Sequence, residues 1–259
     1  MAPGIQREVS IGSCRLFQGD MRQVLPELNL QARLCLSDVP YPLTSGGNTT
    51  GEMNGCFARD RYDNSGALFD MVPWPEMATL IADALAPDAQ AVIMTSDREE
   101  GAAREAFLAA GFGFHRLLVW DKVTATPNRW YMPNCEFALF LYRGKARRIS
   151  DCSSKALVRV RQSDVSGAFR SDGKSHDHPT EKPVELMDYW MRNSVRIGAD
   201  ELVIDPFMGS GATALAALRA GQPFVGIEKD PTWFDVSVAR CQAALHGRQG
   251  HLFEEVAQC

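Results

Sequence analysis

Short apolar runs alternate with longer stretches rich in Ala and Leu along most of the chain. An apolar run bounded by turn residues is typical of a buried strand, whereas an Ala- and Leu-rich stretch of sufficient length is typical of a helix. The pattern therefore predicts helices at 74–85, 99–110 and 212–218, and strands at 32–36, 89–95, 115–120, 135–142, 201–204 and 224–228. Because strands and helices interleave, we expect an α/β fold, and 259 residues suit a single domain, 1–259.

A Gly-rich turn at 205–211, which reads Asp-Pro-Phe-Met-Gly-Ser-Gly, connects a predicted strand to a predicted helix. Ligands bind at such turns because backbone N–H groups and a helix N-terminus point into the crevice there. Gly209 and Gly211 allow the backbone to approach a ligand, and Glu228, at the end of the next strand, is placed to accept hydrogen bonds from ribose hydroxyls. No phosphate-binding motif of the P-loop or G-x-G-x-x-G type occurs. The alternative is an ordinary βαβ unit whose glycines only relieve crowding.

An earlier turn combines a carboxylate, a proline and an aromatic ring. It follows the strand predicted at 32–36 and contains Asp38, Pro40 and Tyr41. Asp38 and a backbone carbonyl beside Pro40 could accept the two N–H hydrogens of an exocyclic amine, while Tyr41 stacks on the base. This group of residues therefore suits a planar amino group. The alternative is a strand end at which Asp38 caps a turn.

Together the two turns resemble the amino-methyltransferases of DNA, which transfer a methyl group from S-adenosylmethionine to N6 of adenine or N4 of cytosine. The turn at 38–41 is similar to the Asp-Pro-Pro-Tyr catalytic motif of this family, and 205–213 is similar to its cofactor loop. The segment 178–183 is similar to its His-Pro-Thr-x-Lys-Pro segment, and 14–20 resembles a strand that ends near the cofactor adenine. The order of the motifs, with the catalytic turn first, is that of the β-type subgroup.

The resemblance implies a Rossmann-like methyltransferase fold with a mixed seven-stranded sheet, helices on both faces and a permuted motif order. It implies S-adenosylmethionine as the cofactor and direct methyl transfer to a flipped adenine, with Asp38, Pro40 and Tyr41 as the catalytic residues. Lys182, or the helix N-terminus at Thr180, would hold the methionine carboxylate. The residues expected to bind the cofactor are Asp20, His178, Thr180, Lys182, Asp205, Phe207, Gly209, Ser210, Gly211, Thr213 and Glu228.

One position departs from the family pattern. Val39 stands where Pro is usual, which gives up one fixed φ angle and restores an N–H. This departure favours a second hypothesis, a non-catalytic nucleic-acid-binding protein with the same fold. Within enzymes, Asp38 favours adenine, because cytosine-N4 enzymes more often have Ser in the first position of the motif. Since Ser37 precedes Asp38, cytosine-N4 methylation is the alternative activity.

The net charge of −5 conceals a local basic excess. Between residues 143 and 174, nine basic residues stand against three acidic ones, an excess of six positive charges. A basic stripe on an acidic body is typical of a surface that grips a phosphate backbone. We therefore expect 143–177 to be a basic insertion that binds double-stranded DNA, although a solvated loop or a surface for an acidic partner is the alternative. The candidate DNA-binding residues are Arg147, Arg148, Arg159, Arg161 and Arg170.

Composition limits the remaining function classes. The chain has no apolar run of membrane-spanning length, so we expect no membrane anchor. We expect the protein in the cytoplasm. Its seven cysteines are scattered without a C-x-x-C, so we expect reduced thiols and no metal site. The resemblance adds two partners to the DNA substrate, a second copy of the chain and a companion restriction endonuclease.

Overall fold

The computed structural model describes residues 4–40, 71–123, 125, 131–161 and 181–256. These residues build one mixed sheet in the order β1-β2-β9-β8-β3-β4-β6-β5-β7. The strands are β1 (Arg7–Ile11), β2 (Cys14–Gln18), β3 (Ala32–Ser37), β4 (Leu85–Thr95), β5 (Phe112–Asp121), β6 (Cys135–Arg143), β7 (Leu157–Arg159), β8 (Val203–Asp205) and β9 (Phe224–Glu228). The helices are α1 (Met21–Leu28), α2 (Trp74–Ala84), α3 (Glu100–Ala109), α4 (Val184–Ser194), α5 (Ala212–Ala220) and α6 (Pro231–Val256).

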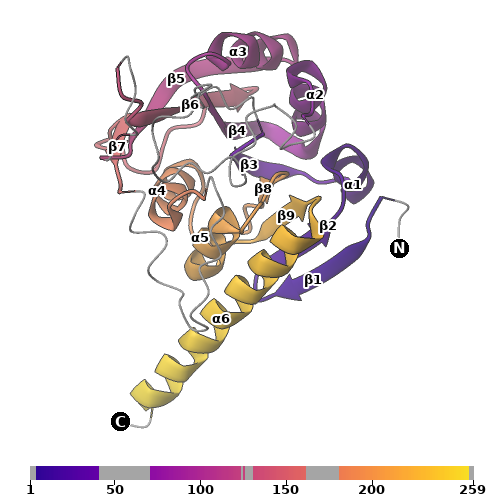
Figure 1. Ribbon diagram of the computed structural model, residues 1–259, viewed down its shortest axis with the longest axis vertical. Helices are drawn as coiled ribbons and strands as arrows, with labels where there is room; N and C mark the ends of the chain where they lie inside the picture. The colour runs from indigo at the N-terminus through magenta and orange to yellow at the C-terminus, as the bar shows by residue number, and fades with distance from the viewer. Residues whose placement is uncertain (1–3, 41–70, 124, 126–130, 162–180, 257–259) are drawn as a thin grey trace, which may run out of the picture.

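Helices cover both faces of the sheet, as predicted (Figure 1). Successive side chains of a strand point to opposite faces, so each buried strand contributes to two apolar layers. In β3, Leu34 and Leu36 pack in the layer beneath α4, α5 and α6, whereas Cys35 packs in the layer beneath α1, α2 and α3. The fold is therefore a three-layer α/β sandwich, and none of its described helices is long and apolar enough to cross a membrane.

The expected count of seven strands is wrong, because two further strands occupy the edges of the sheet. β1 pairs antiparallel with β2, and β7 pairs parallel with β5. β1 is largely exposed and β7 has only three residues, so neither has the buried apolar run that identifies a strand in sequence. The strand expected at 201–204 lies at Val203–Asp205, because the backbone N–H of Glu201 donates to the Ala199 carbonyl in a turn over 2.8 Å.

The sheet brings together strands that carry the two predicted turns, although these strands are far apart in the chain. β3 and β8 are parallel neighbours, with Leu34 beside Val203 and Cys35 beside Ile204. β8 in turn pairs in parallel with β9, and β9 with β2. The carboxyl ends of these four strands therefore meet at one edge of the sheet. In open α/β sheets this is the edge where ligands bind.

Candidate active site

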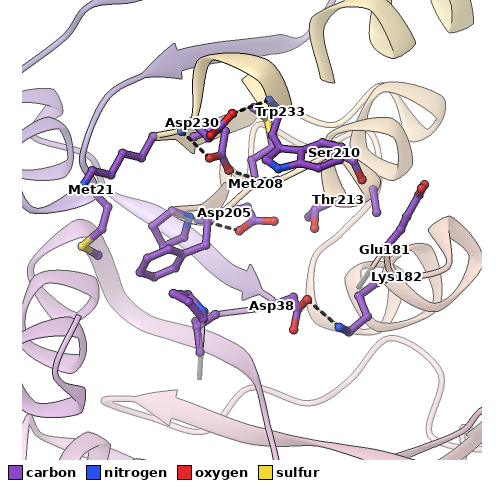
Figure 2. Close-up of a pocket in the computed structure, with 18 of the residues that line it drawn as sticks. Met21, Asp38, Glu181, Lys182, Asp205, Met208, Ser210, Thr213, Asp230 and Trp233 are labelled. Carbon is purple, nitrogen blue, oxygen red and sulfur yellow. Dashed lines mark hydrogen bonds and ion pairs between the residues drawn. The ribbon is translucent and has the colours of Figure 1, made fainter. Parts of the chain in front are cut away.

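A cavity of about 490 Å³ lies at this edge of the sheet (Figure 2). Its volume is in the range of pockets that enclose small cofactors. The predicted site residues that line it are Asp20, Asp38, Pro40, Lys182, Asp205, Phe207, Gly209, Ser210, Thr213 and Glu228. Gly211 lies directly after the loop, at the start of α5. Tyr41, His178, Thr180 and Arg170 lie outside the described residues.

A hydrogen bond joins the last residue of β3, directly before the turn at 38–41, to the first residue of the Gly-rich loop at 205–211. The Ser37 hydroxyl donates to Asp205 Oδ1 over 2.6 Å, and the Phe207 backbone N–H donates to the same oxygen over 3.1 Å. Ser37 and Asp205 are both buried. This bond connects residues 168 positions apart in the chain, so the geometry of one turn depends on that of the other.

Asp205 is a buried carboxyl in the cavity with a raised pKa. Burial raises the pKa of its carboxyl to about 7, although Ser37, Thr213 and the Phe207 N–H oppose this, and the nearby charge of Asp38 raises it further. The folded state therefore holds a proton that the unfolded chain, with a pKa near 3.8, has released. Stability contributed by this group is lost as the pH rises between these two values.

We expect the Asp205→Asn variant to lose less stability with rising pH than the wild type. Between pH 6 and pH 8 the wild-type carboxyl should lower the free energy of unfolding by about 1 kcal/mol, since each pKa unit corresponds to about 1.4 kcal/mol. The amide cannot ionise and keeps an oxygen for Ser37 and Phe207. Urea unfolding at both pH values measures the difference. An equal pH dependence in the two proteins would show that Asp205 does not titrate in this range.

Gly211 adopts a backbone conformation that favours glycine. Its φ is +86°, and a Cβ atom there would lie 2.9 Å from the Ser237 Cβ of α6. Gly221, at the other end of α5, has a φ of +67°, but no atom lies within 4 Å of a Cβ built there. The close approach of the cofactor loop to α6 therefore requires Gly at 211, whereas only the backbone angle favours it at 221.

These two glycines provide a matched pair of variants. Gly221→Ala should lower the free energy of unfolding by about 1 kcal/mol, the cost of a left-handed backbone for Ala. Gly211→Ala should lower it by about 2–3 kcal/mol, since crowding against Ser237 is added. Chemical denaturation of both variants measures the difference. Equal losses would mean that the contact with α6 yields without strain.

Glu228 connects β9 to the cofactor loop. Its Oε2 accepts the Gly209 backbone N–H over 2.8 Å, and its Oε1 accepts that of Asp230 over 2.7 Å. Each carboxylate oxygen can accept a second bond, so the carboxylate retains acceptor capacity for hydroxyl groups. Burial raises its pKa, which these backbone N–H groups oppose. The Trp233 side chain, from the first turn of α6, adds an aromatic wall to the same region (Figure 2).

Asp20 follows β2, which β9 and β8 separate from β3 and Asp38 in the sheet. Its carboxylate binds two cations. Its carboxylate binds the Arg22 guanidinium at 2.6 Å, accepts the Arg22 backbone N–H, and lies 3.1 Å from the Lys229 ammonium. The hydrogen bond from Arg22 holds the pKa of Asp20 well below its usual range. The side chain therefore caps α1 while also lining the cavity.

Asp38 faces the Lys182 ammonium at the opposite end of the cavity, with 2.7 Å between Oδ2 and Nζ. The same Nζ lies 3.4 Å from Oε2 of Glu136, a residue of β6. Burial raises the pKa of Asp38, Lys182 opposes this, and the charge of Glu136 adds to it. By resemblance, Lys182 or the helix N-terminus at Thr180 would hold the methionine carboxylate, and this stays a prediction. The Lys182 ammonium lies between two carboxylates of the protein itself.

The family model described as DNA methylase, N6_N4_Mtase, matches residues 32–239 of this chain. The chain belongs to this family. S-Adenosylmethionine is the methyl donor of the family. Segment 32–239 contains both the catalytic turn and the cofactor loop, so the resemblance that these motifs suggested is confirmed.

Curated relatives show the same kinship. The chain is 25% identical to the Type II methyltransferase M2.DpnII of Streptococcus pneumoniae over 223 residues. The aligned part covers 81% of this chain and 82% of that protein. It is 34% identical to YubD of Escherichia coli K12 over 119 residues, and this aligned part covers 46% of this chain. The chain spans about half the length of YubD and of M2.MboI of Moraxella bovis, 47% and 50%.

Solved structures share the fold. The complex of M1.HpyAVI with S-adenosylmethionine superposes with a TM-score of 0.64 at 22% identity, covering 88% of this chain and 99% of that one. The PvuII DNA methyltransferase, described as cytosine-N4-specific, gives a TM-score of 0.68 at 16% identity, covering 93% of this chain and 95% of that one. The Rossmann-like methyltransferase fold is therefore confirmed for this chain.

The chemistry of the cavity fits the methyl donor of the DNA methylase family. Glu228 offers a carboxylate to ribose hydroxyls, and Trp233 and Phe207 offer apolar surface to a nucleoside. Packing is also close behind the loop, where a Cβ at Gly226 would meet the Met208 side chain and require it to shift. No group of three or more His, Cys, Asp or Glu side chains suited to a metal ion occurs within the described ranges.

The basic residues predicted to bind DNA are in different environments. Arg147 is partly buried and binds Glu201 at 2.7 Å, so it connects the segment after β6 to the start of β8. Arg159 is exposed but pairs with Asp121 at 2.9 Å, and the Nε of Arg148 lies 3.0 Å from Cys152 Sγ. Arg161 is exposed. Of the described group, Arg148, Arg159 and Arg161 are therefore exposed at the surface.

Three features of the site were missed in the sequence. The sequence places Glu136 inside the apolar strand predicted at 135–142, and it gives no prediction for Trp233 or for the helix α6 that carries it. Arg240 of α6 binds Glu181 at 2.5 Å and the Ser210 carbonyl at 2.7 Å, which connects the segment before α4 to the cofactor loop. A polar residue within an apolar strand was the available signal for Glu136, but sequence spacing does not identify its partners.

Proposed function

We propose that the protein is a DNA methyltransferase that transfers a methyl group from S-adenosylmethionine to the N6 amino group of adenine. The observation that carries this proposal is the meeting of Asp38 and the cofactor loop in one cavity, joined by the bond between Ser37 and Asp205. Described residues of both turns line one cavity, which supports a single site for amine and cofactor. Family membership supports DNA as the substrate class.

Residues from three strand ends would hold the cofactor. Glu228 would accept hydrogen bonds from the ribose, Asp20 would lie beside the adenine, and the backbone at Gly209 and Ser210 would border the methionine part. When bound, S-adenosylmethionine supplies an electrophilic methyl group. His178 and Thr180 are proposed to complete the methionine end of the site, as the family resemblance implies.

Asp38 would act on the amine rather than on the cofactor. The lone pair of an exocyclic amine is delocalised into the base, so the amine is a weak nucleophile. When Asp38 and a backbone carbonyl beside Pro40 accept its two N–H hydrogens, the lone pair is directed toward the methyl donor. Tyr41 would stack on the flipped base, whose removal from the helix costs a few kcal/mol.

The environment of Ser37 supports adenine over cytosine. A serine that leads the catalytic motif in a cytosine-N4 enzyme should face the base. Here Ser37 is fully buried and donates its hydroxyl to Asp205, which leaves Asp38 as the polar group that faces the cavity. Cytosine-N4 methylation is the second candidate, because Ser37 and Asp38 adjoin.

Val39 is compatible with an ordered catalytic turn. Its side chain is 2% exposed and packs in the apolar layer beneath α1, α2 and α3. Burial of a β-branched side chain restricts the turn in place of a second proline ring. This packing favours the enzyme over a non-catalytic module.

The remaining parts of the proposal concern partners and organisation. Residues 1–259 would form one methyltransferase domain, with 143–177 as a basic insertion that contacts double-stranded DNA through Arg148, Arg159, Arg161 and Arg170. Arg147 would support this segment through Glu201. A homodimer, a companion restriction endonuclease and a cytoplasmic location are proposed from the resemblance to Type II enzymes.

Expression in a bacterial host that lacks adenine-N6 and cytosine-N4 methylation tests the base assignment. Genomic DNA from this host would be digested to nucleosides and analysed by mass spectrometry, with an Asp38→Ala strain as the control. We expect N6-methyladenine in the wild-type strain only. N4-methylcytosine would overturn the choice of base, and unmodified DNA from a strain with soluble protein would contradict the activity.

A further inference from the structure

A second carboxylate, that of Glu136, does not line the cavity but is connected to Asp38 through Lys182. Glu136 stands on β6, opposite Trp120 of β5, and its side chain is 20% exposed. Its Oε1 lies 3.3 Å from the Lys122 ammonium, and its Oε2 lies 3.4 Å from the Lys182 ammonium. Oε2 is buried without a hydrogen bond, so the attraction to Lys182 is ionic. Burial would raise the pKa of Glu136, but the two lysines outweigh it and lower that pKa.

Lys182 is shared unequally between the two carboxylates. Its side chain is 6% exposed, and Nζ lies closer to Asp38 than to Glu136, at 2.7 Å against 3.4 Å. A buried ammonium adjusts its position to balance the charges around it. The attraction of Lys182 to Glu136 therefore competes with its attraction to Asp38. This competition weakens the ion pair between Lys182 and Asp38.

We propose that Glu136 is a positioning residue that acts through Lys182 to keep the Asp38 carboxylate oriented and available for the amino group of the target base. The proposal rests on the proposed methyltransferase function. Glu136 does not line the cavity, so it acts on Asp38 and not on the substrate. Its position on β6 couples the antiparallel half of the sheet to the catalytic turn after β3.

Removal of the Glu136 charge should strengthen the pairing of Lys182 with Asp38. An Asp38 carboxylate held more firmly by an ammonium is a weaker acceptor for the amine, so methyl transfer should slow. Three groups face Asp38, namely Lys182 before α4, Glu136 on β6 and Asp205 after β8. Loss of the negative charge of Glu136 should lower the pH at which Asp38 titrates, since Asp205 holds a proton below about pH 7.

The Glu136→Gln variant tests the proposal with two readouts. Single-turnover methyl transfer should slow by about 10- to 100-fold at the pH optimum, while the Kd for S-adenosylmethionine stays within about twofold. The acid limb of the rate profile should move down by about one pH unit. In ¹³C NMR of Asp-labelled protein, the Asp38 carboxyl signal, assigned by its loss in Asp38→Asn, should titrate at a correspondingly lower pH.

Two further variants serve as controls. Glu185→Gln makes the same chemical change on α4 at a side chain that is 63% exposed, and it should match the wild type in rate and pH profile. Glu136→Asp, which keeps the charge on a shorter side chain, should restore part of the rate.

The outcomes separate this proposal from the proposed function. An Asp38 titration or a transfer rate in Glu136→Gln equal to that of Glu185→Gln would overturn the positioning role. A slower rate with an unchanged pH profile and a lowered unfolding temperature would also overturn it, because it would indicate a structural role alone. A wild-type protein that methylates no DNA would contradict the proposed function instead, and the NMR titration would still decide the coupling of Glu136 to Asp38.

Discussion

Replacement of Asp38 by alanine is expected to lower the rate of methyl transfer by about 10²- to 10³-fold. The variant loses the acceptor that orients the exocyclic amine, and the lone pair of the amine returns to the ring. The Kd for S-adenosylmethionine should change little, because Glu228, Asp20 and the cofactor loop lie at other strand ends. The fold should persist, since Lys182 keeps Glu136 as a carboxylate partner.

Single-turnover kinetics with saturating cofactor and DNA measures the effect of this change. Asp38→Asn is the matched variant, because the amide keeps the shape of the side chain and one oxygen acceptor but loses the charge. We expect its rate to lie between those of the wild type and Asp38→Ala. Turnover of Asp38→Ala at the wild-type rate would exclude the role assigned to this carboxylate.

The largest loss of stability is expected for Lys182→Met. Removal of one member of a buried ion pair costs about 3–5 kcal/mol, because its partner remains buried without a counter-charge. Here two carboxylates, Asp38 and Glu136, would lose the cation between them. Lys229→Met provides a control, since Lys229 is about half exposed and pairs with Asp20 near the surface, where such pairs contribute about 0–1 kcal/mol.

The loss in Lys182→Met should depend on pH in a defined direction. Without the ammonium, the pKa values of Asp38 and Glu136 rise in the folded state, so the folded variant binds protons that the unfolded chain does not. Its stability relative to the wild type should therefore be higher at pH 5.5 than at pH 8. Urea unfolding at the two pH values measures this. A loss that is the same at both values, or as small as that of Lys229→Met, would show that the ammonium does not balance these carboxylates.

The positions of the two turns could be predicted because each follows a strand with a clear apolar pattern. Asp38 and Asp205 were both expected at carboxyl ends of strands, and the sheet order then places these ends side by side. Their connection through the Ser37 hydroxyl could not be predicted. Spacing along the chain does not show which side chains of two parallel strands meet.

Partners of charged residues were the least predictable part of the site. Arg147 counted toward a basic stripe, yet it binds Glu201, which is more than fifty residues away in the chain. Lys182 lines the cavity, but its pairing with Asp38 and Glu136 was not predicted. A count of charged residues predicts only the net charge of a segment. Which charged side chains form ion pairs depends on the fold, which brings β6 and the segment before α4 together.

The edge strands were missed for a related reason. β1 gains its conformation from antiparallel pairing with β2, and β7 from three residues beside β5. Most residues of both strands are exposed, and only Ile11 of the two strands is fully buried, so neither strand has the run of buried apolar residues that identifies a strand in sequence. Pairing with a neighbour, and not local hydrophobicity, determines their structure.

The account is tested most directly by incubation of the purified protein with unmethylated DNA and S-adenosylmethionine that carries a ¹³C-labelled methyl group. Mass spectrometry of the nucleosides then shows where the label resides, and Asp38→Ala is treated in parallel. We expect the label on N6 of adenine with the wild type and about 10²- to 10³-fold less with the variant. Absence of label from DNA exposed to wild-type protein that binds the cofactor would contradict methyl transfer to a DNA base.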